Sequence, residues 1–136
     1  MDANPPTRSV VPPDGCPAIR VVMMPRDTNG QGTIFGGVIL SYIDQAGFVE
    51  ACRQASHHYV TVCMNKVEFR DAVFVGDILS LFAETLRIGR SSILVRVQAF
   101  AQRTTGTPET ILVTDAEVTF VAVDEHRRPT PIKPIK

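Results

Sequence analysis

The chain has 136 residues, of which 44% are hydrophobic and 21% charged, and its 14 basic side chains balance its 14 acidic ones. This length fits one globular domain with a hydrophobic core and is too short for two. A net charge of zero excludes the general attraction by which basic proteins bind nucleic acids, so we expect no nucleic-acid partner. The three cysteines form no C-x-x-C pair, and the apolar run 33–49 is short for a membrane span. We therefore expect a cytoplasmic protein without a metal site or a membrane partner.

The first half of the chain predicts a proline-rich arm, a short strand, a loop and a helix, in that order. Residues 1–17 contain five prolines and predict a flexible arm. Residues 18–24 predict a strand that ends before Pro25, and residues 26–37 predict a loop because they contain four glycines. Residues 38–55 predict the one long helix, and its nearly all-round apolar surface indicates that other elements cover it.

Every expected element after the helix is a strand. Four segments combine β-branched and aromatic residues with alternating apolar and polar side chains, namely 59–70, 77–88, 92–103 and 110–124. The alternation changes phase after Met64, as a β-bulge would cause. Because the links have hairpin length, we expect these four strands to form an antiparallel meander. The predicted fold class is α+β, with the domain at 18–125 and an extended tail at 126–136.

Asp44 lies on an apolar face of the predicted helix. Its neighbours on that face are Leu40, Gly47, Phe48 and Ala51. An ionised carboxylate among apolar groups is costly unless it is paired, so a sequence that keeps one usually uses it. Asp44 is therefore a candidate catalytic group. The alternatives are a hydrogen bond to a backbone amide or a place at a subunit boundary.

Three segments carry a resemblance to one known family. The first and most specific is Met24-Pro25-x-Asp27-Thr28-Asn29-x-x-Gly32-x-Ile34-Phe35-Gly36-Gly37, followed by Asp44. The second is Val60-Thr61-Val62, with Val67-x-Phe69 and Val75-Gly76-Asp77 downstream, and the third is Gly89-Arg90-Ser91-Ser92. Together they resemble the hot-dog-fold acyl-CoA thioesterases, in the acyl-CoA hydrolase branch that includes the bacterial YciA-type enzymes. The chain departs from the family at Asp71-Ala72, where a proline is usual, and at Ser91-Ser92-Ile93, where Thr-Ser-Met is usual.

The resemblance implies a hot-dog fold, in which a five-stranded antiparallel sheet wraps a central helix, and cofactor-free hydrolysis of acyl-CoA to acid and coenzyme A. Asp44 would act as general base, or alternatively as nucleophile. Asn29 would face it across a homodimer interface and orient water or substrate. The alternative for Asn29 is a turn residue before Gly30. Thr61 is a lesser candidate that could bond Asp44 or the water.

We expect an amide near Gly36 or Gly37 to donate to the oxyanion, because amides at a helix N-terminus are unpaired and lie at the positive end of the helix dipole. The alternative is that these glycines merely permit close packing. Gly37 lies about 10 Å from Asp44 along the helix axis, at roughly 1.5 Å per residue, which is far for one helix to aim both groups at one atom. This separation also favours a site shared between subunits.

The turn at Gly89, Arg90, Ser91 and Ser92 offers a guanidinium, hydroxyls and amides to the phosphates of CoA. The alternative is a simple hairpin turn with a solvated arginine. Phe35 is a further candidate for contact with the substrate. The sequence does not rank the other cations that could contribute, which are Lys66, Arg70, Arg127, Lys133 and Lys136.

The resemblance also implies a homodimer, and three such dimers would assemble into a hexamer. Two other functions of hot-dog proteins are alternatives to hydrolysis. A hot-dog dehydratase needs a histidine in the active centre, and the predicted helix has none. A non-catalytic acyl-CoA-binding regulatory module stays open as the alternative, because fold alone does not decide function.

Overall fold

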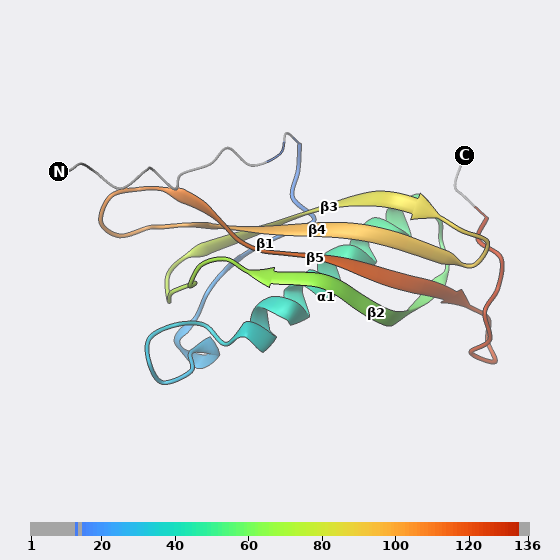
Figure 1. The fold of residues 1–136 in the computed structure, drawn as a ribbon, viewed down its shortest axis with the longest axis horizontal. Helices are drawn as coiled ribbons and strands as arrows, with labels where there is room; N and C mark the ends of the chain where they lie inside the picture. Colours follow the sequence, from blue (N-terminus) through green and yellow to red (C-terminus); the bar gives the residue numbers. More distant parts are fainter. Residues whose placement is uncertain (1–12, 14, 134–136) are drawn as a thin grey trace.

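A computed structural model describes residues 13 and 15–133, and it contains one long helix lying across one antiparallel sheet (Figure 1). The elements are β1 (Ile19–Val22), the 3-10 turn η1 (Pro25–Asp27), α1 (Gly36–Gln54), β2 (His58–Phe69), β3 (Ile78–Ile88), β4 (Ser92–Gln102) and β5 (Thr110–Val123). The predicted α+β class with five strands and one long helix is confirmed. Most of the predicted N-terminal arm and the end of the predicted tail lie outside the described residues. No helix in the described part of the chain is long and apolar enough to cross a membrane.

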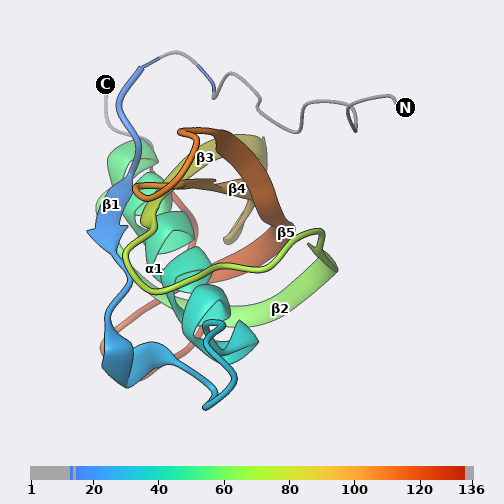
Figure 2. The same cartoon turned by 90° about the vertical axis from the view of Figure 1, so that its left-hand side faces the viewer.

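The strand order is β1-β3-β4-β5-β2, and every neighbouring pair is antiparallel. The predicted meander is right for β3, β4 and β5 but wrong for β2, which pairs with β5 instead of β3. The link between β2 and β3 is therefore a crossover, and it passes the helix in Figure 2. Its backbone partners lie before the helix, since the amide of Ile34 donates to the oxygen of Val73 at 2.8 Å and Thr33 bridges Phe74. The length of the link between β2 and β3 does not show that β2 pairs with β5, which lies far from it in the sequence.

Strand β2 is an irregular edge strand. Its register with β5 shifts between Thr61 and Cys63 and again between Asn65 and Glu68. The predicted phase change after Met64 falls at the second shift, where Lys66 has a left-handed φ of 53°. β2 has no strand partner on its outer side among residues 13 and 15–133. An open edge of this kind is a natural place for pairing with another chain.

The helix packs on the sheet through small and β-branched residues. Ile39, Ile43 and Ala46 of α1 are fully or almost fully buried. The closest approach is at Gly47, where an added Cβ would lie 2.8 Å from a ring carbon of the buried Phe120. The sequence places glycine here because no larger side chain fits between helix and sheet.

Gly47→Ala should therefore destabilise the fold. We expect a loss of about 1–3 kcal/mol from overpacking, reduced by up to about 1 kcal/mol because alanine favours helix more than glycine. Urea denaturation at one fixed protein concentration measures the change. Gly37→Ala is the matched control in the same helix, since a Cβ there would meet nothing within 4 Å. Equal stability of the two variants would contradict the packing argument.

Candidate functional site

Asp44 projects from the middle of α1 toward the edge strand β2. Its Oδ1 accepts a hydrogen bond of 2.6 Å from the hydroxyl of Thr61. Within residues 13 and 15–133, no backbone amide donates to Asp44 and its Oδ2 accepts no hydrogen bond. The carboxylate is half-buried. One oxygen is thus held in place, and the other is available to a water molecule or substrate.

Large apolar side chains are exposed along the helix that carries Asp44 and along the edge strand that carries Thr61. On α1 and just before it, Phe35, Phe48 and Val49 are each at least 43% exposed, and on β2 Val62 and Phe69 are more than half exposed. Exposed apolar groups beside an unpaired strand edge mark a surface that another protein chain covers.

The glycine-rich loop holds Asn29 by bonds of its own. The Asn29 Nδ2 donates to the hydroxyl of Thr33 at 2.7 Å, and its Oδ1 accepts from the amide of Gln31 at 2.9 Å. Gly30 and Gly32 have φ values of 84° and 92°, which favour glycine. Within one protomer Asn29 is thus a turn residue. No hydrogen bond joins it to Asp44 in the described part of the chain.

The helix begins two residues earlier than predicted, so Gly36 and Gly37 form its first turn. The preceding Phe35 provides no side-chain cap, and the two glycine amides have no hydrogen-bond partner among the described residues. A Cβ on Gly36 would lie 3.2 Å from the ring of Phe69, so packing explains that glycine. Gly37 has open space beside it and no left-handed φ. Packing within the protomer therefore does not explain Gly37, which leaves its amide accessible to an anion.

The Arg90 turn lies at the other end of the protomer. The amide of Gly89 donates to the oxygen of Ser92 at 2.8 Å and closes the β3–β4 hairpin. Figure 1 shows this hairpin near the C-terminal end of α1, far from the helix N-terminus. One protomer therefore does not bring Arg90, Ser91 or Ser92 to the first turn of the helix.

The second carboxylate on the helix, Glu50, is hydrogen-bonded to neighbouring side chains and has a structural role. Its oxygens accept hydrogen bonds from Arg53 at 2.9 Å, from Gln54 at 3.1 Å and from Thr85 of β3 at 2.8 Å. Burial pushes the pKa of Glu50 up, but the hydrogen bonds from Arg53, Thr85 and Gln54 together outweigh it and hold the pKa below its ordinary value. Glu50 is thus a paired anion that joins helix and sheet.

A buried ion pair supports the loop before the helix. Arg103, at the end of β4, pairs with Asp77 and also donates to the oxygen of Ala72 at 3.0 Å. Its guanidinium lies 4.9 Å from the centre of the Phe74 ring. These contacts fix the crossover whose Val73 bonds the glycine-rich loop. In the sequence, Val75-Gly76-Asp77 stands out only as part of the family resemblance, because Arg103, the partner of Asp77, follows another strand.

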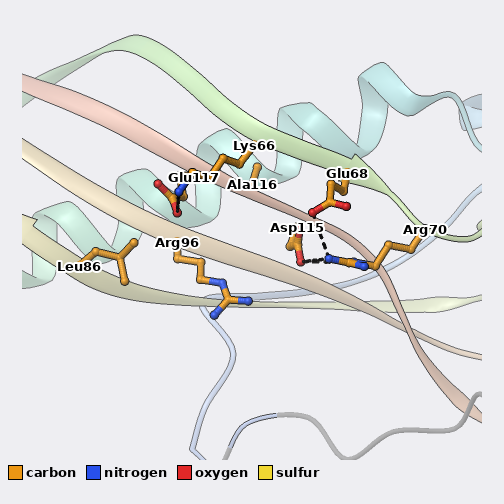
Figure 3. Close-up of a pocket in the computed structure, with 8 residues that line it drawn as sticks. All are labelled: Lys66, Glu68, Arg70, Leu86, Arg96, Asp115, Ala116 and Glu117. Carbon is orange, nitrogen blue, oxygen red and sulfur yellow. Dashed lines mark hydrogen bonds and ion pairs between the residues drawn. The ribbon is translucent and has the colours of Figure 1, made fainter.

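A hollow of about 260 Å³ lies on the face of the sheet turned away from α1 (Figure 3). Its lining residues are Lys66, Glu68, Arg70, Leu86, Arg96, Asp115, Ala116 and Glu117. Arg70 pairs with Asp115 at 3.0 Å, and Lys66 pairs with Glu117 at 3.5 Å. These two cations are thus neutralised on a face that does not include Asp44.

The sequence of this chain is similar to those of known proteins. Residues 31–107 match the model of the thioesterase superfamily. A Zymomonas mobilis protein named as an acyl-CoA thioester hydrolase is 42% identical over 123 residues, which are 90% of this chain and 82% of that protein.

Two solved structures are similar in sequence and in shape. Cj0915, a hexameric hotdog-fold thioesterase of Campylobacter jejuni, is 43% identical with a TM-score of 0.83, over 88% of this chain and 91% of that one. HI0827, a hexameric broad-specificity acyl-coenzyme A thioesterase solved as an aspartate-to-alanine mutant, is 36% identical with a TM-score of 0.83, over 88% of each chain. The predicted hot-dog fold is confirmed.

Proposed function

Because this chain belongs to the thioesterase superfamily, we propose that it hydrolyses acyl-CoA to a free carboxylic acid and coenzyme A. Similar proteins that are named acyl-CoA thioester hydrolases support this substrate. The observation that carries the proposal is the burial and hydrogen bonding of the Asp44 carboxylate. Its carboxylate is half-buried, one oxygen is held by Thr61 at 2.6 Å, and the other accepts no hydrogen bond from any residue that the structure describes.

In the proposed mechanism Asp44 is the general base. Its free oxygen takes a proton from a water molecule, and the water oxygen attacks the carbonyl carbon of the thioester. The carbonyl oxygen becomes negatively charged and accepts a hydrogen bond from the Gly37 amide of the other subunit, at the positive end of that subunit's helix dipole. The carbon–sulfur bond then breaks, the thiolate of CoA leaves, and the proton held by Asp44 passes to that thiolate or to solvent, which restores the base. Thr61 keeps the carboxylate oriented throughout.

We propose that two protomers pair through β2 to complete this site. A two-fold contact is self-complementary, so antiparallel pairing of the two β2 edges reverses the partner. The partner's α1 then runs in the opposite direction, which places its C-terminal end and its Arg90 hairpin beside the first turn of this helix. The same reversal allows Asn29 of one subunit to approach Asp44 of the other. The hexameric relatives support a trimer of such dimers.

The experiment that tests the activity is CoA release, followed with a thiol reagent, on acyl-CoAs from acetyl to palmitoyl and on an aryl-CoA. We expect turnover by the wild-type protein, and the best substrate names the acyl class. Tight acyl-CoA binding without turnover would contradict the proposal and indicate a regulatory acyl-CoA-binding module.

Gly37→Ala should impair turnover while leaving the fold intact. A Cβ at this position meets no atom of the protomer within 4 Å, so stability should stay within about 0.5 kcal/mol. The added methyl group would instead obstruct the approach of the thioester carbonyl to the amide. We expect kcat to fall about 10²-fold, as for a weakened oxyanion contact. Unchanged kcat would remove Gly37 from the proposed mechanism.

A further inference from the structure

The C-terminal tail at 129–133 crosses one end of the sheet (Figure 1). The amide of Thr130 donates to the oxygen of Ala122 in β5 at 2.9 Å, and the amide of Ile132 donates to the oxygen of Arg90 in the β3–β4 hairpin at 2.8 Å. The Ile132 side chain is half-buried and packs against the hydrophobic core. This tail is thus a strap that joins β5 to the hairpin.

A side chain holds the far end of the strap. The amide of Lys133 donates to Nε2 of His57 at 3.1 Å, and His57 lies in the link between α1 and β2. The half-buried His57 lies edge-on to the ring of Tyr59, with 6.0 Å between the ring centres. Tyr59 is itself fixed, because its hydroxyl donates to the oxygen of Ala55 at 2.8 Å. His57 is therefore a supported acceptor for the last backbone bond of the strap.

The bond between His57 and Lys133 requires a neutral imidazole. A neutral histidine has one nitrogen that accepts a hydrogen bond, whereas a protonated histidine donates from both nitrogens and accepts from neither. Protonated His57 would therefore direct an N–H group at the N–H of Lys133. Histidine is the side chain that ordinarily changes its charge between pH 5 and 8. The bond is thus present above this range and is lost as the pH falls through it.

The elements packed at this end of the molecule offer His57 no anion. The titratable or charged groups that they bring here are Cys52 and Arg53 of α1, His58 and Tyr59 of β2, Arg90 of the hairpin and Lys133 of the strap. Burial raises the pKa of Cys52 and of Tyr59, so both are neutral at pH 5–8. The other groups are cations or a histidine.

The acids of the neighbouring segments have partners of their own. Glu50 is bonded within the helix and to β3. The Asp124 Oδ1 accepts from the amides of His126 at 2.8 Å and Arg128 at 3.0 Å, and Glu125 lies 3.8 Å from His126. Among the residues that the structure describes, no carboxylate lies within 4.0 Å of His57. Protonated His57 would therefore have no counterion to compensate for the lost bond.

We propose that the His57–Lys133 bond makes the C-terminal strap a pH-sensitive latch, which is closed when His57 is neutral and opens when His57 is protonated. Opening withdraws Ile132 from the core and removes the bond between the strap and the Arg90 oxygen. The latch is a property of the fold and is independent of acyl-CoA hydrolysis.

Hydrogen exchange on the full-length protein, at about pH 7.5 and about pH 5.5, tests the latch across the range in which histidine titrates. Each rate is expressed as a protection factor, which removes the intrinsic effect of pH on exchange. We expect the protection of the Thr130 and Ile132 amides to fall about tenfold at the lower pH, as for the loss of one hydrogen bond. The amides of the β4–β5 ladder are the internal control and should keep their protection.

The chain has three histidines, which are His57, His58 and His126, so single replacements assign the response. His57→Gln keeps an acceptor near the position of Nε2 but does not titrate, so the strap should stay protected at both pH values. His57→Phe keeps a ring beside Tyr59 but has no acceptor, so protection should be low at both. His58→Gln and His126→Gln are the matched controls and should respond to pH as the wild type does.

Three results would overturn the latch. The first is equal protection of the wild-type strap at both pH values. The second is a pH response that persists in both His57 variants or disappears in either control, which would assign the response to another group. The third is a loss of protection in the β4–β5 ladder together with the strap, which would show general unfolding.

Discussion

Replacing Asp44 by asparagine should lower kcat for acyl-CoA hydrolysis by about 10²–10⁴-fold, the usual contribution of a positioned general base. Asparagine has nearly the same shape, and its oxygen can still accept the hydrogen bond that Thr61 donates at 2.6 Å. The amide, however, cannot take a proton from water. KM should change little, because the proposed contacts with CoA lie elsewhere. Steady-state kinetics of CoA release on the best substrate measures both parameters.

Glu50→Gln is the matched control for this substitution. It makes the same chemical change on the same helix, but Glu50 is bonded to Arg53, Gln54 and Thr85 and does not reach the edge strand. We expect this variant to lose stability and to keep its kcat. A large loss of kcat in both variants would indicate that any change of charge on α1 disturbs the site. Full activity of Asp44→Asn would refute the assignment of the base.

The elements that the sequence predicts well are those set by local pattern. Local sequence pattern located α1 and all five strands with ends close to those observed. The partner of β2 was predicted wrongly because strand pairing is a non-local property. The crossover from β2 to β3 is bonded to the chain before the helix, where the amide of Ile34 donates to the oxygen of Val73, and no local pattern indicates this contact.

The same distinction applies to the candidate site. Asp44 and the glycine-rich loop stand out in sequence because a carboxylate on an apolar face and a cluster of glycines are unusual in themselves, whereas Thr61 is a candidate only through the resemblance. The Arg103 pair could not be found this way. Arg103 is an ordinary end to a strand until it is placed against Asp77.

The second large effect is expected from Arg103→Met, which should destabilise the protein by about 3–5 kcal/mol because it leaves a buried carboxylate without its cation. Asp77 is only 3% exposed and would keep the amide of Phe74 as a donor at 2.9 Å. Arg103→Lys retains the charge but loses the fork that reaches Ala72, so its loss should be smaller. Denaturant unfolding at one protein concentration measures both.

We also expect the Arg103–Asp77 pair to affect turnover. The pair fixes the crossover, and the crossover is bonded to the chain just before the helix. The oxygen of Val73 accepts from the amide of Ile34, and Phe35, Gly36 and Gly37 follow directly. We therefore expect Arg103→Lys to lower kcat at temperatures where the variant is still fully folded. Gly47→Ala is the control, since it weakens the packing of α1 on the sheet away from the loop. If Arg103→Lys kept full kcat while losing stability, the pair would hold the sheet together without positioning the helix N-terminus.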